Sequence, residues 1–248
     1  VKLITKTIGL NEFENQSIDN IIVGQARVSS GKIGEELFET PEKLLRHCIL
    51  NGHLSIFELA NLGFEIETSM SIGEELLRHT AGKTKFSFRY AESTAYEPVE
   101  IRKQCENNRQ SSTEVFDPIM YESNGNCEYA SDYVRYIQEG ANEYYKALIE
   151  KGVAREVSRF VMPACTTTKI YMNFRIRELI TLLNVRLHKT AQKEMRQLAN
   201  IIKDILIKEC PIISQALYNF DNAYNVHILD RVVLEKFKVY NLIDKKYF

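Results

Sequence analysis

The sequence predicts an α+β fold in which a central, twisted, mainly antiparallel sheet is flanked by helices in a single domain over residues 1–248. Strand-like segments lie between helical segments without the regular strand–helix–strand alternation of a parallel α/β sheet. A chain of 248 residues is long enough to bury a sizeable core. The sequence contains no linker-like stretch, internal repeat or low-complexity tract that would divide it.

Helices are expected where apolar residues recur three and four positions apart between capping residues. Pro41 suits a first helical position and Gly52 a helix end. Ser71 opens a capping-box pattern, and Pro163 and Pro211 stop two later helices. The expected helices cover about residues 41–51, 71–79, 129–151, 154–162, 176–183 and 191–205.

Strands are expected over three segments, 62–66, 84–91 and 166–173. In the second of these, Lys85, Ser87 and Arg89 would share one face, opposite three aromatic residues. That face would present a hydroxyl group and two cations to a ligand.

The stretch 92–127 is polar and is expected to be mostly loop, which in a compact domain is often functional. The tail from Val226 onward shows no clear pattern.

The composition excludes several classes of protein. The net charge of -1 argues against a general nucleic-acid binder, and no apolar run is long enough to span a membrane. The N-terminal residues lack the apolar stretch of a signal peptide, so a cytoplasmic enzyme is expected. Five scattered cysteines without a CxxC pair indicate reduced thiols and no metal site.

Arginine is the residue type most suggestive of a ligand site. Its forked guanidinium grips phosphate, carboxylate or an imide edge better than lysine does. The alternative is that these arginines are solvated helix charges paired with Glu156, Glu178 and Glu194. The residues concerned are Arg155, Arg159, Arg175, Arg177, Arg186 and Arg196.

Other candidates carry less weight. His53 and His79 each end an apolar segment and have no second histidine at metal-ligand spacing, and Cys165 has no adjacent base. No glycine-rich phosphate loop is present. The residues alone therefore indicate an enzyme-like domain with an anionic ligand.

Six collinear segments take the argument further. They are 26–29 (ARVS), 51–58 (NGHLSIFE), 78–90 (RHT, then SFRY), 102–111 (RKQ, then NNRQS), 155–163 (REVSR, then P) and 177–194 (REL, NVRL and AQKE). Together they resemble the flavin-dependent thymidylate synthase family over about residues 26–209.

The resemblance implies two sets of site residues. Flavin adenine dinucleotide (FAD) would be bound at Ser55, Arg78, His79, Thr80, Arg175, Arg177 and Thr181. The nucleotide would be bound at Glu75, Arg78, Lys85, Ser87, Phe88, Arg89, Arg159 and Arg186.

The resemblance also implies a reaction, the reductive methylation of dUMP to dTMP. Arg186 matches the arginine at the imide edge of the pyrimidine, where a cation stabilises charge that develops on the ring. FAD, NADPH and 5,10-methylenetetrahydrofolate would be the cofactors, and no cysteine nucleophile would be needed. Family members are homotetramers whose active sites are built from several subunits.

The chain departs from the family pattern at ligand positions. Thr80 replaces an arginine of the family pattern, and Glu75 replaces a frequent glutamine. Arg175 replaces a usual asparagine, and Thr181 replaces a usual asparagine or histidine. The gap from Thr80 to Ser87 is also one residue short. The site would be about two charges less positive than the family's, unless Arg175 or another cation, Lys85, makes up the difference.

Two alternatives follow from these departures. One is an enzyme with the same flavin chemistry at C5 of another pyrimidine nucleotide, such as UMP or a cytosine nucleotide. The other is a degenerate protein that binds flavin or nucleotide without turnover.

Overall fold

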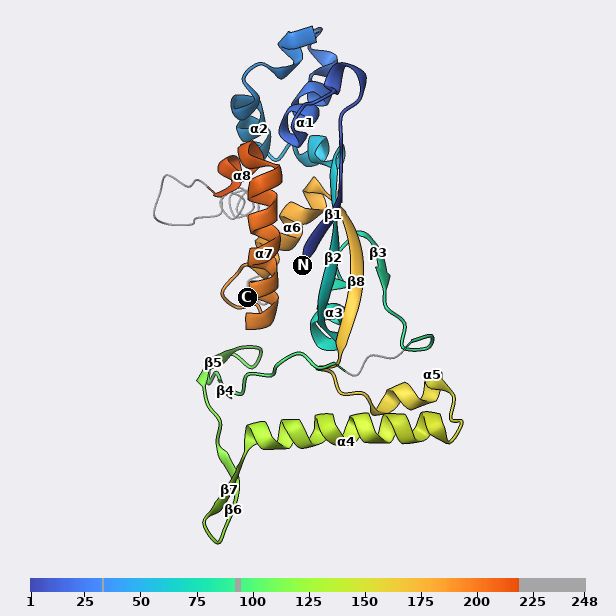
Figure 1. Cartoon of the computed structure of the whole chain (residues 1–248). Helices are drawn as coiled ribbons and strands as arrows, with labels where there is room; N and C mark the ends of the chain where they lie inside the picture. The colour runs from blue at the N-terminus through green and yellow to red at the C-terminus, as the bar shows by residue number, and fades with distance from the viewer. Residues whose placement is uncertain (33, 92–94, 219–248) are drawn as a thin grey trace, which may run out of the picture. The chain divides into compact units, whose positions relative to one another are not determined.

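The computed structural model describes residues 1–32, 34–91 and 95–218 (Figure 1). The tail from Val226, for which the sequence gave no clear pattern, lies outside the described residues. The strands are β1 (Lys2–Lys6), β2 (Asn61–Ser69), β3 (Gly82–Lys85), β4 (Arg102–Gln104), β5 (Ser112–Val115), β6 (Ile119–Ser123), β7 (Asn126–Tyr129) and β8 (Thr167–Arg175). The helices are α1 (Ile18–Ala26), α2 (Pro41–Leu50), α3 (Met70–Leu76), α4 (Ala130–Glu150), α5 (Arg155–Ser158), α6 (Ile176–Arg186), α7 (Lys193–Glu209) and α8 (Pro211–Tyr218).

Four strands form one sheet in the order β1-β2-β8-β3. The Ile176 amide donates to the Ala60 carbonyl at one end of the β2–β8 pair, and the Met70 amide donates to the Thr166 carbonyl at the other, both at 2.9 Å. Residue numbers therefore rise along β2 as they fall along β8, which makes the two strands antiparallel. The remaining strands form two antiparallel hairpins, β4–β5 and β6–β7. The prediction of an α+β fold with a mainly antiparallel sheet is confirmed.

The described chain falls into two compact units, each made of separate segments. The first comprises 1–64, 173–188 and the chain from 196 on, and the second comprises 65–172 and 189–195. Both β2 and β8 run through the boundary. The prediction that residues 1–248 form a single domain stays a prediction.

The first unit has a helical core. Helices α1, α2 and α8 contact one another, and α6 packs on the short 3-10 helix η4 (Leu54–Glu58). Leu45, Cys48 and Ile49 are buried on α2, as their helical spacing predicts. The buried Asp19 carboxylate accepts hydrogen bonds from the Ile212 and Ile213 amides at 3.0 and 3.1 Å. It thereby satisfies two amides at the start of α8 that have no helical partner.

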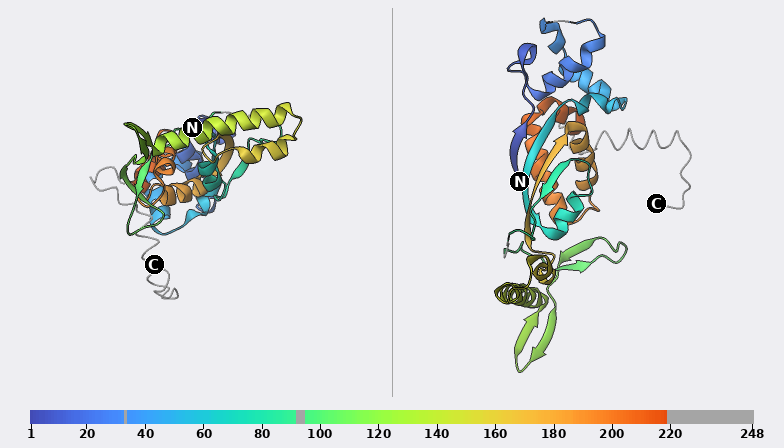
Figure 2. Two further views of the ribbon diagram at one scale, coloured as in Figure 1. Left: turned by 90° about the horizontal axis from the view of Figure 1, so that it is seen from below. Right: turned by 90° about the vertical axis from the view of Figure 1, so that its right-hand side faces the viewer.

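The second unit packs α3 on β8 and α4 on α5. A Cβ on Gly73 would lie 3.1 Å from Ile170 and 3.2 Å from Thr168, so a larger residue there would push α3 off the strand. Helix α4 runs beside α5 in Figure 1 and in both views of Figure 2. It ends before Gly152, whose φ of 80° lies in the left-handed region that glycine adopts readily.

Three expectations from the sequence are corrected. Helix α3 begins at Met70 after Ser69 rather than at a Ser71 capping box. The strand expected over 84–91 ends at Lys85, and the chain then turns, with the Tyr90 amide donating to the Ser87 carbonyl at 3.0 Å. The expected loop over 92–127 contains most of the two hairpins.

Candidate active site

The first unit carries five of the expected site residues on η4 and α6. Ser55 is exposed on η4, and Arg175, Arg177, Thr181 and Arg186 follow one another from the start to the end of α6. The contact between η4 and α6 brings Ser55 and the start of α6 into one region. These are four of the seven expected flavin positions and the proposed catalytic arginine.

Glu58 links this group. Its carboxylate accepts a hydrogen bond from Arg175 Nη1 at 3.3 Å and a second, short one from Arg177 Nη1. Glu58 lies within the NGHLSIFE segment, but its sequence position gave it no role. A carboxylate between two guanidiniums fixes both arginines and ties η4 to α6.

Arg175 is also tied to its own helix. It precedes α6, and Glu178 accepts from the Arg175 amide at 3.1 Å and from Arg175 Nε at 2.9 Å. Burial opposes ionisation of Glu178, but the bonds from Arg175 outweigh it and leave the pKa of Glu178 below its usual value. Arg175 is thus engaged by two carboxylates.

Two other residues of α6 complete the group. Thr181 Oγ1 donates to the Arg177 carbonyl at 3.0 Å, so its hydroxyl stays with the helix backbone. Arg186 is the last residue of the helix and is half-buried. A cation at a helix C-terminus is favoured by the helix dipole.

The second unit carries the other nine expected residues, with Arg78, His79 and Thr80 in the turn after α3. Lys83 Nζ donates to the Leu77 carbonyl at 2.5 Å and to the His79 carbonyl at 2.9 Å. The ammonium therefore holds this turn in shape. Lys83 was not among the expected residues, because nothing in its sequence position distinguishes it from a solvated lysine.

The remaining six lie on α3, at the end of β3 and just after it, and in the segment 155–161. Lys85 pairs with Glu74. Arg89 Nη2 lies 3.2 Å from Glu156 Oε2, and Arg159 Nε donates to the carbonyl of the same Glu156 at 3.2 Å. Glu156 therefore brings these two arginines together. Besides Phe88, the other two of these positions are Glu75 and Ser87, and both are half-buried.

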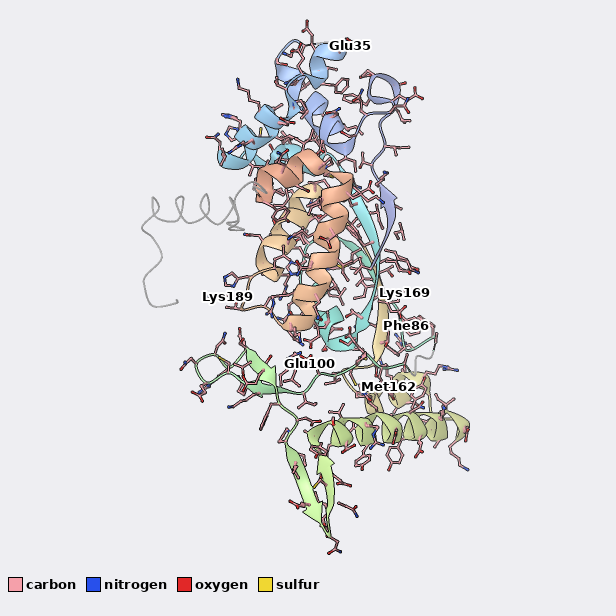
Figure 3. All side chains as sticks on the ribbon, turned by 60° about the vertical axis from the view of Figure 1, so that its left-hand side comes forward. Glu35, Phe86, Glu100, Met162, Lys169 and Lys189 are labelled. Carbon is pink, nitrogen blue, oxygen red and sulfur yellow. The ribbon has the colours of Figure 1, made fainter. Side chains whose placement is uncertain are left out.

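Phe88, one of the expected nucleotide positions, has little exposed surface. It is buried and its ring meets that of Phe86 edge to face, with 5.1 Å between centroids. The Phe86 amide in turn donates to the Lys169 carbonyl at 2.8 Å, and both residues are labelled in Figure 3. A ligand contact at position 88 would therefore come from the backbone.

Lys85 and Arg175 are the two cations that the sequence offered to make up for the charge changed at Thr80 and Glu75. Lys85 is paired with Glu74, and Arg175 with Glu58 and Glu178. Both of these cations therefore already face a carboxylate. The alternative that these arginines pair with Glu156, Glu178 and Glu194 holds for Arg175 with Glu178, whereas Glu156 pairs with Arg89, which was not among them.

Comparison with known proteins identifies the family. Residues 12–212 match the family described as thymidylate synthase complementing protein. The flavin-dependent thymidylate synthase of Synechocystis sp. is 34% identical over 217 residues, which are 86% of this chain and 96% of that protein. The chain belongs to the flavin-dependent thymidylate synthase family. The resemblance drawn from the six sequence segments is confirmed, and the chain is an enzyme of the thymidylate synthase-like methyltransferase type.

One more relative supports the family, and one solved structure supports the fold. The probable flavin-dependent thymidylate synthase of Paramecium bursaria Chlorella virus 1 is 35% identical over 218 residues, 87% of this chain and 97% of that protein. The crystal structure of a UMP/dUMP methylase, PolB, from Streptomyces cacaoi bound with 5-Br dUMP superposes with a TM-score of 0.68. It is 22% identical and covers 87% of this chain and 93% of its own, so it supports the fold.

Two features are absent from the described residues. Across 1–32, 34–91 and 95–218 there is no group of three histidine, cysteine or acidic side chains that could hold a metal ion. In the same part of the chain, no helix has the length and apolar character needed to cross a membrane.

Proposed function

We propose that this enzyme converts dUMP to dTMP by flavin-dependent reductive methylation. The carbon would come from 5,10-methylenetetrahydrofolate and the electrons from NADPH. The observation that carries the proposal is the match of the chain to the family over residues 12–212. Six of the fourteen expected site positions are arginines.

The donor set of the first unit suits an anionic cofactor such as FAD. The Arg177 side chain is 47% exposed although it pairs with Glu58, and the Ser55 hydroxyl is on the surface. Guanidinium and hydroxyl donors of this kind bind diphosphate oxygens. Arg78, His79 and Thr80 would complete the flavin contacts, with Arg175 and Thr181 holding the backbone of α6. When bound, FAD would supply the hydride chemistry.

The second group would hold the nucleotide. Arg78, Arg89 and Arg159 would bind its phosphate with the Ser87 hydroxyl, and Glu75, Lys85 and the Phe88 backbone would border it. Arg186 would donate to the imide edge of the pyrimidine, which stabilises negative charge on the ring and makes C5 more nucleophilic. The other expected property, assembly as a homotetramer, would be read from a light-scattering mass of four chains.

A second candidate, the same chemistry on another pyrimidine nucleotide, is favoured by one observation. Lys85 and Arg175 already face carboxylates, so neither replaces the charge changed at Thr80 and Glu75. A less positive site would hold dUMP more weakly or would favour a nucleotide of different shape, for example UMP or a cytosine nucleotide. A protein that binds flavin without turnover is the remaining alternative.

Flavin spectroscopy separates these candidates. Purified protein titrated with FAD should shift the flavin absorption bands, and NADPH should then bleach them. Bleaching that responds to dUMP supports the leading proposal, and bleaching that responds to UMP or a cytosine nucleotide instead supports the second. Flavin binding without bleaching would favour a protein that does not turn over. No spectral shift at high micromolar FAD would exclude the flavoenzyme.

A further inference from the structure

The side chain of Glu58 lies beside the position proposed for the flavin diphosphate. Residues three positions apart in a 3-10 helix lie on the same side of it. Ser55 and Glu58 have this spacing on η4, so the exposed Ser55 hydroxyl and the Glu58 carboxylate share one side. The same carboxylate accepts a hydrogen bond from Arg177. An incoming anion would be repelled by a carboxylate in this position unless another cation neutralises it.

The Arg177 guanidinium is held only weakly by Glu58. Among residues 1–32, 34–91 and 95–218, Glu58 is the one carboxylate that pairs with it. The Arg177 side chain is 47% exposed and that of Glu58 35%, so water screens the pair. Exposed ion pairs contribute little to stability, whereas bonds from a guanidinium to diphosphate oxygens are charge-assisted and stronger. A diphosphate would therefore draw Arg177 away from Glu58.

Arg175 is held in place more firmly than Arg177. The residue after it, Ile176, donates its amide to the Ala60 carbonyl at 2.9 Å, which fixes the junction of β8 and α6 beside the end of η4. Glu178 accepts hydrogen bonds from the Arg175 amide at 3.1 Å and from Arg175 Nε at 2.9 Å, and its own side chain is only 12% exposed. These bonds keep the Arg175 guanidinium near Glu58 whether or not a ligand is bound.

We propose that Glu58 changes partners when FAD binds: it pairs with Arg177 and Arg175 in the flavin-free protein and with Arg175 alone in the complex. The two arginines use different oxygens, because Arg177 bonds Oε1 and Arg175 Nη1 lies 3.3 Å from Oε2. Arg177 can therefore leave without stranding the Glu58 charge beside the diphosphate. Arg175 acts through Glu58, as a positioning residue, rather than on the flavin itself. The inference rests on the proposed flavin-dependent function.

A double-variant cycle on FAD affinity tests the exchange. Calorimetry is carried out on the full chain as wild type, Arg175→Gln, Glu58→Gln and the double variant. Arg175→Gln should weaken FAD binding about tenfold, because Glu58 would then face the diphosphate without a cation. Glu58→Gln should tighten binding about threefold, because Arg177 no longer has to leave a carboxylate. With Glu58 already replaced, adding Arg175→Gln should change the affinity by less than about twofold.

Two controls separate the charge of Arg175 from its shape and from the net charge of the chain. Arg175→Lys keeps the cation without the planar fork, so it should recover most of the affinity that Arg175→Gln loses. Arg135→Gln removes the same charge from another exposed pair with a carboxylate three positions away. The Arg135 side chain is 54% exposed, against 47% for Arg175. This control should leave the affinity for FAD unchanged.

Thermal unfolding gives a second reading that needs no turnover. If Arg177 leaves Glu58 in the complex, Glu58→Gln removes a contact that only the flavin-free protein has. Glu58→Gln should therefore lower Tm more in the flavin-free protein than in protein saturated with FAD. Equal losses in the two forms would contradict the exchange.

The possible affinities distinguish the inference from the proposed function. A loss from Arg175→Gln that disappears when Glu58 is also replaced supports the inference. A loss of the same size in both backgrounds overturns it, because Arg175 would then bind the flavin directly. Weaker binding by Glu58→Gln overturns it as well. These two results leave the flavin-dependent function standing, whereas no binding of FAD by the wild type would overturn both.

Discussion

The Arg102–Glu194 ion pair should be among the most stabilising polar contacts of the second unit. Arg102 Nη1 lies 2.6 Å from Glu194 Oε1, and Nη2 donates to Oε2 at 3.0 Å. Arg102 also donates to Glu100 at 3.1 Å and to Ser112 Oγ at 2.9 Å. The Arg102 side chain is only 11% exposed and that of Glu194 22%, so water does little to screen the pair. The pair fastens the segment 189–195, which follows Arg186, to the hairpin strand β4.

Replacing Arg102 by Gln removes these bonds and leaves Glu194 without its cation. Hydrogen bonds to charged groups contribute about 1.5–3 kcal/mol each, and the loss of one partner from a largely buried pair costs more than an average bond. We expect the free energy of unfolding to fall by about 2–3 kcal/mol. In a chain of this size, that lowers Tm by roughly 5–10 °C. Urea denaturation followed by circular dichroism measures the change.

The stability that the Arg102–Glu194 pair contributes should change with pH in a definite direction. Burial opposes ionisation of Glu194, but the bonds from Arg102 outweigh it and hold the pKa of Glu194 below its usual value. The stabilisation is therefore fully present above the unfolded pKa, about 4.3, and is lost as pH falls through the folded pKa. The difference between wild type and Arg102→Gln should be constant above about pH 5 and shrink in acid.

The control is Arg135→Gln. Arg135 Nη2 lies 2.8 Å from Asp132 Oδ1, but the Arg135 side chain is 54% exposed. Solvent screens that pair, so the change in stability should be much smaller. Equal losses from both substitutions, or a loss from Arg102→Gln that does not change with pH, would refute the reasoning.

Three further predictions concern ligand binding and turnover. Arg186→Lys should keep the fold and lower kcat by about 10²–10³, since lysine cannot present the planar fork; an unchanged kcat would refute the role. Glu75→Gln with Thr80→Arg should tighten dUMP or FAD binding in calorimetry, because one charge at about 4 Å is worth about 4 kcal/mol before desolvation. If dUMP already binds tightly and the pair of changes adds nothing, the loop has been rebuilt around the same ligand. Lys83→Met should weaken FAD binding about fivefold through loss of two bonds that shape the turn after α3, and Lys103→Met should not; equal effects would contradict this.

Periodicity predicted the long elements of the fold well. The segments 41–51, 62–66 and 129–151 were expected from apolar spacing and end residues, and α2, β2 and α4 lie there. Such segments pack one face on a core, so their pattern records their structure.

Local geometry was predicted less well. Asn124 and Gly125 have φ of 51° and 79°, the two successive positive values of a tight hairpin turn. That dipeptide signals a hairpin, but the prediction of a loop was made from the polar composition of 92–127 and did not use it. The alternation of 84–91 failed for another reason. After Lys85 the chain turns at Ser87, and the packing of Phe88 against Phe86 accounts for two of the three aromatic residues, whereas Tyr90 is exposed.

For the site, the sequence identified candidate arginines and a nearby partner, Glu178 for Arg175, but not the partners that lie far away in the sequence. Arg175 meets Glu58 across 117 positions of sequence, and Arg89 meets Glu156 across 67. No spacing rule covers contacts at such separations. The sequence therefore left open whether Arg175 makes up for the lost cation, and the structure shows that Arg175 faces Glu58 and Glu178.

The most direct test of the proposed function is product analysis in a complete reaction. Purified protein, FAD, NADPH, 5,10-methylenetetrahydrofolate and dUMP are incubated together and the nucleotides are resolved by mass spectrometry. The account predicts dTMP that depends on each component, with little or none from Arg186→Lys. A protein that binds FAD, is reduced by NADPH and yet forms no dTMP, or forms as much with Arg186→Lys, would contradict it.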